Sequence, residues 1–226
     1  MNEDIARDST PSAPLEPWVF GNRPLPQTVA LTRSLRRLAA TSLSLEEGEA
    51  RVARLIEELS AAEQELAQRA PADPSPRIGP DARPAQRVYL DHGSDIWAFN
   101  PCFPEYAIRV AGERATGTVT FPLVFEGPPG CVHGGFLAVF FDCAIQHHNC
   151  ELGVAGKTTS LNMEYHRPTP LLTALNFEIA RSADSRRITS TAHIERDGKV
   201  LCRARMEAVA GDRSRLPFVS PRRDRP

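Results

Sequence analysis

The sequence predicts an α+β protein in which an antiparallel sheet wraps around one long central helix, with an added N-terminal helical segment. Three patterns support this fold class. Residues 134–151 form an apolar stretch of helix length, strand-like segments of alternating polarity stand on both sides of it, and residues 28–70 have the composition of helices. Strands, one long helix and then strands again is the order expected when a sheet curls around a single helix.

Residues 28–70 are expected to form a helical hairpin, with a first helix from Thr28 to about Ser42 and a second from Leu45 to Ala70. Ser44 and Glu47 have the spacing of a capping box at the start of the second helix. That helix carries an apolar stripe at three-four spacing, formed by Val52, Leu55, Leu59, Ala62 and Leu66. The stripe lasts barely two heptads, so we expect it to pack on its own domain or on a second subunit and not to form an independent coiled coil.

Proline-rich or aperiodic segments divide the rest of the chain. Residues 1–27 are expected to be a flexible arm in which Trp18, Val19 and Phe20 are available to dock on a partner surface. Residues 71–86 carry repeated prolines and are expected to act as a semi-rigid linker. The main domain is placed at residues 87–211, followed by a flexible tail at 212–226.

Within the main domain, residues 106–125 predict two strands around an Ala-Gly-Glu-Arg turn, and the chain from Lys157 onwards predicts four more strands. Between the last two, Asp197-Gly198 is a strong signal for a tight hairpin. The helix between the two strand groups is expected from Gly134 to Glu151.

Composition narrows the function classes. The 226 residues have a net charge of −1, which gives no support for a nucleic-acid or membrane-surface partner. The five cysteines are odd in number and form no CxxC pair, so a disulfide framework is not expected and a reducing compartment fits. No apolar leader and no run of about 18 apolar residues is present, so we expect a cytoplasmic protein.

One carboxylate interrupts the apolar run of the central helix. Asp142 directly follows Phe136–Phe141, and burial there would raise its pKa, as a general base or nucleophile requires. The alternative is a charge near a helix end that reaches solvent or meets an arginine. Gly134 and Gly135 open the same helix, where free backbone amides make an oxyanion site, unless they serve only a tight strand-to-helix turn.

The spacing of these two features bears on the assembly. Gly134 and Asp142 are eight residues apart, which is about 12 Å along one helix. That is too far for both to act on the same carbonyl. If both act, an antiparallel helix pair about a two-fold axis would bring one chain's Gly134 near the other chain's Asp142. The motif therefore predicts a homodimer.

Two motifs in order resemble a known family. The segments are EGPPGCVHGGFLAVFFDCA, which starts at Glu126, and TTSLNMEYHRPTPL, which starts at Thr158. Over roughly residues 88–210 the chain resembles the hot-dog fold acyl-CoA thioesterases of the PaaI type, particularly the branch of thioesterase superfamily member 4. The resemblance implies hydrolysis of an acyl-CoA to free acid and CoA, with CoA as part of the substrate and no metal or other cofactor.

The resemblance also assigns roles by position. Asp142 matches the catalytic carboxylate, Thr158 the hydroxyl that positions the attacking water, and Gly134, followed by Gly135, the amide that polarises the thioester carbonyl. His133 matches the residue that orders the turn. Relatives work as dimers with sites at the interface, and some assemble further into tetramers. The Asn or Gln that some relatives place about six residues before this His is absent, because Glu126-Gly127 stands there.

Substrate contacts are less specific in the sequence. His166 and Arg167 are the candidates for binding the CoA moiety, with Arg203 and Arg205 as weaker ones. The helix carries three phenylalanines, Phe136, Phe140 and Phe141. They would either limit the length of the acyl chain or only fill the hydrophobic core, and the core role is favoured.

Competing interpretations remain at this level. Asp142 and His147 have the D-x4-H spacing of hot-dog enoyl-CoA hydratases, but five residues turn a helix by about 500° and leave the two side chains about 140° apart. A metal site would need residues that lack standard zinc spacing, namely Cys131, His133, Cys143, His147, His148 and Cys150. The fold class also fits a non-catalytic acyl-CoA-binding or assembly protein, and it fits a thioesterase for carrier-protein-bound acyl groups.

Overall fold

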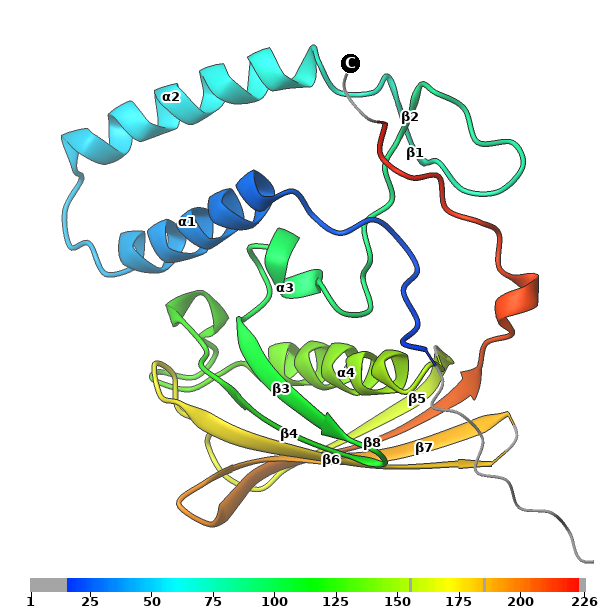
Figure 1. Ribbon diagram of the computed structural model, residues 1–226. Helices are drawn as coiled ribbons and strands as arrows, with labels where there is room; N and C mark the ends of the chain where they lie inside the picture. Colours follow the sequence, from blue (N-terminus) through cyan, green and yellow to red (C-terminus); the bar gives the residue numbers. More distant parts are fainter. Residues whose placement is uncertain (1–15, 155, 185, 224–226) are drawn as a thin grey trace, which may run out of the picture.

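A six-stranded antiparallel sheet curves around one long helix at the centre of the protein (Figure 1). The computed structural model describes residues 16–154, 156–184 and 186–223. Strand order in the sheet is β3-β4-β6-β7-β8-β5, so β3 and β5 are its edges. The predicted α+β class, with a sheet wrapped around one helix, is confirmed.

The elements of this domain lie close to where the sequence predicts them. Helix α4 covers Gly134–Glu151. The turn between β7 and β8 consists of Asp197 and Gly198, with φ of 52° and 70°, which is the left-handed backbone of a two-residue hairpin. The six strands are β3 (Tyr106–Ala111), β4 (Arg114–Val119), β5 (Gly156–Tyr165), β6 (Leu175–Asp184), β7 (Arg187–Arg196) and β8 (Lys199–Ala210).

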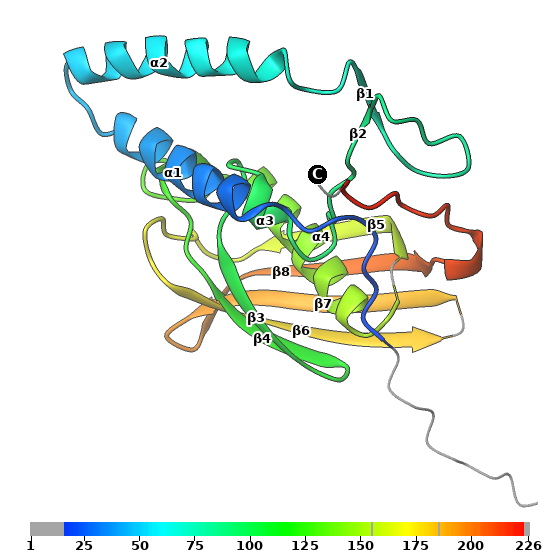
Figure 2. The ribbon, with the colours of Figure 1, turned by 45° about the horizontal axis from the view of Figure 1, so that its top comes forward.

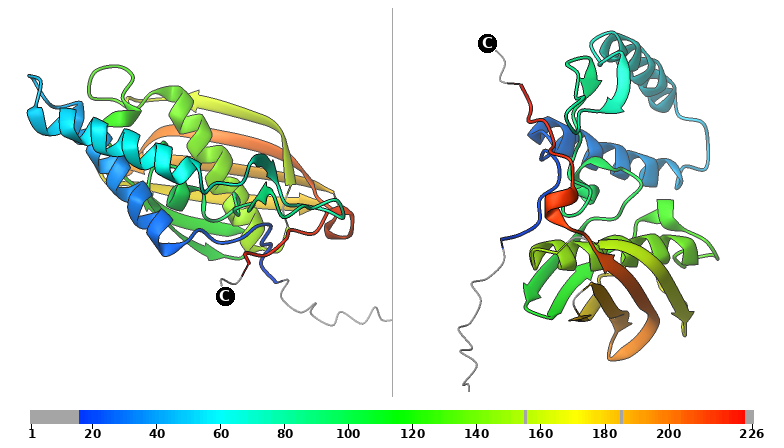
Figure 3. Two further views of the ribbon diagram at one scale, coloured as in Figure 1. Left: turned by 90° about the horizontal axis from the view of Figure 1, so that it is seen from above. Right: turned by 90° about the vertical axis from the view of Figure 1, so that its right-hand side faces the viewer.

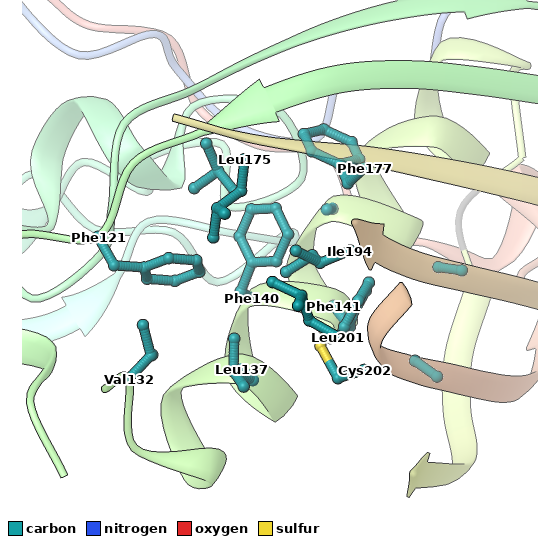
Figure 4. Packing of buried hydrophobic residues seen from close by; sticks show 14 of the residues in the cluster. Phe121, Val132, Leu137, Phe140, Phe141, Leu175, Phe177, Ile194, Leu201 and Cys202 are labelled. Carbon is teal, nitrogen blue, oxygen red and sulfur yellow. The ribbon is translucent and has the colours of Figure 1, made fainter. Parts of the chain in front are cut away.

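The core lies between α4 and the concave face of the sheet. Phe140 is fully buried, and its ring centroid lies 5.3 Å from that of Phe177 on β6 and 5.6 Å from that of Phe121 (Figure 4). Phe141 is also fully buried, which confirms the core role expected for these two phenylalanines. Full burial of a phenylalanine side chain contributes about 1.5–3 kcal/mol, so this contact fixes α4 in the sheet.

Helix α4 is not covered on every face, contrary to the expectation from its apolar sequence. The curved sheet reaches only part of the helix circumference, and Val139 remains 49 % exposed. The face without cover consists of the exposed or half-buried residues Gly135, Val139, Asp142, Cys143 and Gln146.

Two helices precede this domain, α1 (Pro26–Ser42) and α2 (Ala50–Ala67), in line with the helices expected there. Proline at the first turn of α1 fits its start, because that position needs no amide donor. The capping box expected at Ser44 and Glu47 is wrong: α2 begins after Glu49, which makes no side-chain capping bond.

The two helices differ in their attachment. Arg36 of α1 is 4 % exposed and donates to the carbonyl oxygens of Trp97 and Asn100, at the short helix α3 (Ile96–Phe99), and to the Glu105 carboxylate. In contrast, α2 stands away from the sheet and has no buried residue (Figures 2 and 3). Its apolar stripe therefore does not pack on its own domain within the described residues.

The segment expected as a linker has some regular structure. Strands β1 (Asp73–Pro76) and β2 (Gln86–Arg87) form a two-stranded parallel pair, and Ile78 bridges to Val219 near the C-terminus. The short pair is compatible with the prolines because they remain outside a central strand.

Parts of the expected arm and tail also contact the domain. The amide of Trp18 donates to the Cys150 carbonyl oxygen at 2.7 Å, its indole is buried, and Arg213 lies over the ring at 4.7 Å. The rest of the expected arm, residues 1–15, and the end of the expected tail, residues 224–226, lie outside the described residues.

The described residues also include two 3-10 turns, η1 (Leu123–Phe125) and η2 (Arg213–Arg215). None of the helices in the described ranges is both long and apolar enough to cross a membrane.

Candidate active site

Asp142 lies on the uncovered face of α4, and its side chain is half-buried in the single chain. The expectation of a buried carboxylate is therefore wrong at this level, because the sheet covers the opposite side of the helix. Its carboxylate accepts a hydrogen bond from the Thr158 hydroxyl, with 2.8 Å between Oγ1 and Oδ1. The structure thus brings together the two side chains that the motifs assign to catalysis.

A bulge in β5 places Thr158. The register against β8 pairs Thr158 with Ala208 and Ser160 with Glu207, so an extra residue, Thr159, stands between them. Because a one-residue shift moves a side chain to the other face of a sheet, the bulge puts Thr158 on the same side as Leu161, which packs on the core. β-Bulges are common beside active sites because they redirect a side chain in this way.

The N-terminus of α4 has one free amide in the position expected for an oxyanion donor. His133 is the N-cap residue, and its Nδ1 accepts from the amide of Gly135 at 3.0 Å. The amide of Gly134 makes no hydrogen bond within the described part of the chain. His133 therefore occupies one of the two glycine amides and leaves the Gly134 amide available to a ligand.

The loop before α4 is held by its own side chains. The Glu126 carboxylate accepts from the amide of Gly130 at 2.7 Å, and Gly130 has a φ of +75° that favours glycine. A Cβ on Gly127 would lie 2.8 Å from the Cα of His133, so the loop passes beside the cap residue only with glycine there. Glu126 thus stabilises the turn before α4 as a hydrogen-bond acceptor.

Tyr165, at the end of β5, is a contact of this helix terminus that was not predicted from the sequence. Its hydroxyl donates to the Gly134 carbonyl oxygen at 2.9 Å. A Cβ on Gly134 would lie 3.1–3.2 Å from three atoms of the Tyr165 side chain. Glycine at 134 therefore permits the close approach of this ring, a role that sequence spacing alone does not indicate.

Gln146 is a second contact that was not predicted. It lies one helical turn after Asp142, and its amide nitrogen donates to the Thr158 hydroxyl oxygen at 3.0 Å. Its spacing of four from Asp142 was the available signal, because residues four apart share one face of a helix.

The structure separates Asp142 from His147, the pair of the hydratase interpretation. The ring Nδ1 of His147 lies 2.6 Å from the Tyr106 hydroxyl, and its Nε2 lies 3.6 Å from the Glu151 carboxylate. Burial lowers the pKa of His147. Nδ1 is therefore hydrogen-bonded to Tyr106 and Nε2 faces Glu151, and neither nitrogen contacts the Asp142 carboxylate, which disfavours a shared acid-base role. No group of three or more metal-binding side chains is present among the residues that the structure describes.

The candidates for CoA binding lie apart from Asp142 within one chain. His166 and Arg167 follow Tyr165 and are exposed, and Arg167 donates to the Val200 carbonyl oxygen at 2.7 Å. Arg203 and Arg205 alternate with the buried residues of β8, so they lie on the convex face of the sheet. There they line a shallow hollow of about 370 Å³.

Gly134 is the first residue of α4, and Asp142 lies eight residues further along the same helix. The separation of about 12 Å along the helix axis follows from eight residues at 1.5 Å each. In the single chain the free amide and the carboxylate therefore cannot contact the same carbonyl group.

The six-stranded sheet wrapped around α4 is the hot-dog fold. No protein-family model matches the sequence, and no curated protein matches it. Among solved structures, the chain is similar to a crystal structure described as a thioesterase superfamily protein, with 28% identity, 86% of this chain and 97% of that chain covered, and a TM-score of 0.65. The structural neighbours are thioesterase superfamily proteins of the hot-dog fold, as the motifs predict.

Other solved structures match about half of this chain. A hypothetical thioesterase from Streptococcus pneumoniae with coenzyme A is 18% identical over 47% of this chain and 88% of that chain, with a TM-score of 0.45. Zebrafish thioesterase superfamily member 2 is 14% identical over 47% of this chain and 81% of that chain, with a TM-score of 0.43.

Proposed function

We propose that this protein is a thioesterase that hydrolyses an acyl-CoA to the free carboxylic acid and CoA. The observation that carries the proposal is the 2.8 Å hydrogen bond between the Thr158 hydroxyl and the Asp142 carboxylate. Asp142 lies on the same helix as the free amide of Gly134. A carboxylate, a hydroxyl that orients its surroundings and an unpaired amide donor are the groups that thioester hydrolysis needs.

The chemistry follows from these groups. The Gly134 amide binds the thioester carbonyl oxygen and stabilises the negative charge that develops on it. Asp142 accepts the proton of a water that attacks the carbonyl carbon, or its carboxylate attacks that carbon first and water then hydrolyses the anhydride. Collapse of the tetrahedral intermediate breaks the carbon-sulfur bond, and the CoA thiolate takes up a proton.

Each site uses two chains in this proposal. The uncovered face of α4 from Gly135 to Gln146 includes the exposed Val139, and β5 is an edge strand of the sheet. Both surfaces are available to a second copy, because an exposed apolar side chain and an unpaired strand edge favour association. In an antiparallel pair of α4 helices, the Gly134 amide of one chain lies near Asp142 of the other. A homodimer with two equal sites follows, and pairing of dimers into a tetramer would use surfaces outside this interface.

The CoA moiety is proposed to bind where β5 ends. His166 and Arg167 are exposed there and follow Tyr165, which contacts Gly134. An arginine fork suits a phosphate oxygen of CoA, and the histidine adds a second donor. The Arg167 side chain now bonds to a backbone carbonyl on β8, so binding a phosphate would require it to change partner.

The test is thiol release from a panel of short, medium, long and aryl acyl-CoAs, with wild type and Asp142→Asn compared at equal concentration. We expect turnover of at least one acyl-CoA and a fall in kcat of about 10²–10⁴ in the variant, the contribution of a positioned acid-base group. Sedimentation of the same preparations measures the dimer. If wild type binds acyl-CoAs without turnover, the protein is a binding module. If it hydrolyses only carrier-protein thioesters, the substrate class changes and the reaction stands.

A further inference from the structure

A chain of hydrogen bonds continues from Asp142 through Thr158 and Gln146 to Asn149. Thr158 Oγ1 donates to Asp142 Oδ1 at 2.8 Å, and Gln146 Nε2 donates to Thr158 Oγ1 at 3.0 Å. Asn149 Nδ2 donates to Gln146 Oε1 at 3.3 Å. Three of the four residues lie on α4 and the fourth lies at the bulge of β5, so the chain fastens the helix to that strand.

The direction of this chain is set by its end at Asp142. An ionised carboxylate only accepts hydrogen bonds, so the single hydrogen of the Thr158 hydroxyl has to point at Asp142. The Thr158 oxygen then only accepts, so Gln146 has to turn its amide nitrogen towards it. Gln146 consequently turns its oxygen to Asn149, which has to donate. The orientation of each amide follows from the charge on Asp142, independently of how amide atoms are assigned.

The alternative partners near these groups are weak. The sulfur of Met206 lies 3.8 Å from both Thr158 Oγ1 and Gln146 Nε2. Thioether sulfur is a poor acceptor, so the shorter contacts to oxygen prevail. Asn149 is fully buried, which restricts its movement away from Gln146.

We infer that Gln146 is a positioning residue that orients the Thr158 hydroxyl towards Asp142. This inference deepens the proposed function and rests on it. With Gln146 in place, the Thr158 hydroxyl donates a hydrogen bond to Asp142, accepts one from Gln146 and keeps one lone pair. That lone pair accepts a hydrogen bond from the attacking water, whose other hydrogen points to Asp142. Without Gln146 the hydroxyl rotates, and the carboxylate and the water lose a fixed partner.

The kinetic test is a double-mutant cycle on the full-length chain with an acyl-CoA that wild type hydrolyses. Gln146→Met keeps the side-chain length and removes the donor. We expect kcat to fall about fivefold, the effect of one neutral hydrogen bond, with KM within about twofold of wild type. In a Thr158→Val background the same change should have no further effect on kcat, because the hydroxyl that it orients is gone. Wild-type kcat in Gln146→Met, or two effects that multiply in the double variant, would overturn the inference.

Two further variants guard against a purely structural effect. Gln64→Met makes the same chemical change on the exposed helix α2 and should leave kcat unchanged. Gln146→Glu keeps the shape but replaces the donor with an acceptor, so it should lower kcat at least as much as Gln146→Met. If the thermal melt shows that Gln146→Met does not fold, Gln146→Glu alone tests the role of Gln146. A wild-type kcat in Gln146→Glu then overturns the inference.

A spectroscopic readout does not require turnover. In ¹⁵N-labelled protein, the side-chain amide signals of Gln146 should shift as Asp142 titrates, because the hydrogen bonds connect them. The shift should disappear in Thr158→Val and in Asp142→Asn. The second variant also separates Asp142 from the other titratable groups of α4 and of the strands next to it, which are Tyr106, Cys143, His147, His148, Cys150, Glu151, Tyr165 and Cys202.

The two readouts keep the hypotheses apart. A Gln146 shift that persists in Thr158→Val contradicts the hydrogen-bond chain whether or not the protein is an enzyme. Absence of turnover together with a Gln146 shift that requires Thr158 contradicts the thioesterase proposal but supports the chain of hydrogen bonds. Loss of activity in Asp142→Asn with full activity in Gln146→Met retains the thioesterase and removes the role of Gln146.

Discussion

The amide of Gly134 offers the sharpest test of the proposed site, through Gly134→Pro. Proline removes the amide hydrogen, and Gly134 is the first residue of α4, where proline is well tolerated. His133 has φ of −63° and ψ of 131°, the extended backbone that a following proline requires. Loss of the amide hydrogen itself removes no hydrogen bond from the fold, because this amide has no partner within the described residues. Stability should therefore change little while the proposed donor disappears.

The magnitude is obtained by comparison with Gly134→Ala. Both variants place a Cβ 3.1 Å from Cζ of Tyr165, so both disturb that ring, and its 2.9 Å hydrogen bond to the Gly134 carbonyl oxygen contributes about 1 kcal/mol. Alanine should thus lower kcat by at most about fivefold. Proline additionally removes an oxyanion donor, which is worth about 10²–10³ in kcat.

The assay is thiol release from the preferred acyl-CoA, with circular dichroism and a thermal melt as folding controls. We expect kcat of Gly134→Pro to lie about 100-fold or more below that of Gly134→Ala. Equal kcat values in two folded variants would refute the assignment of the Gly134 amide as the oxyanion donor.

Two further predictions concern stability. Arg36→Ala should lower the free energy of unfolding, measured in urea, by about 2–3 kcal/mol, because two backbone carbonyls and a carboxylate lose a buried donor. The control is Arg37→Ala at the exposed neighbouring residue, which should lower it by less than about 0.5 kcal/mol. Equal losses in the two variants would contradict the anchoring role of Arg36. Burial lowers the pKa of His148 below its usual 6.5. Below about pH 6.5, His148 therefore binds a proton in the unfolded chain but stays neutral in the folded one. The free energy of unfolding should fall as the pH drops below about 6.5. His148→Gln should flatten this slope in urea titrations at several pH values, and an unchanged slope would exclude His148 as its source.

Much of the fold follows from local sequence patterns. The bounds of α4 follow from a continuous apolar stretch that begins at a glycine pair, and the β7–β8 hairpin follows from Asp197-Gly198. These patterns succeed because periodicity and left-handed turns are properties of neighbouring residues. The capping box predicted at Ser44 is wrong, because the N-cap of α2 is Glu49, five residues later. The short strands β1 and β2 were not predicted, because each forms only by pairing with a segment that is not adjacent in the sequence.

The candidate site divides in the same way. Sequence motifs single out Asp142, Thr158 and Gly134, but Thr158 and Leu161 are three residues apart and would lie on opposite faces of a regular strand. The β5 bulge places both on the helix side. Gln146 and Tyr165 carry no motif of their own, so their contacts with Thr158 and Gly134 emerge only when helix and strand pack together.

By itself, the sequence determined the helix, the strands and the chemical groups available to the site, since each depends on residues that are adjacent along the chain. The tertiary structure decided which of these groups meet, which amide is left free and which helix face is uncovered. Those outcomes depend on strand register and on the curvature of the sheet, which are set by packing between segments far apart in the sequence.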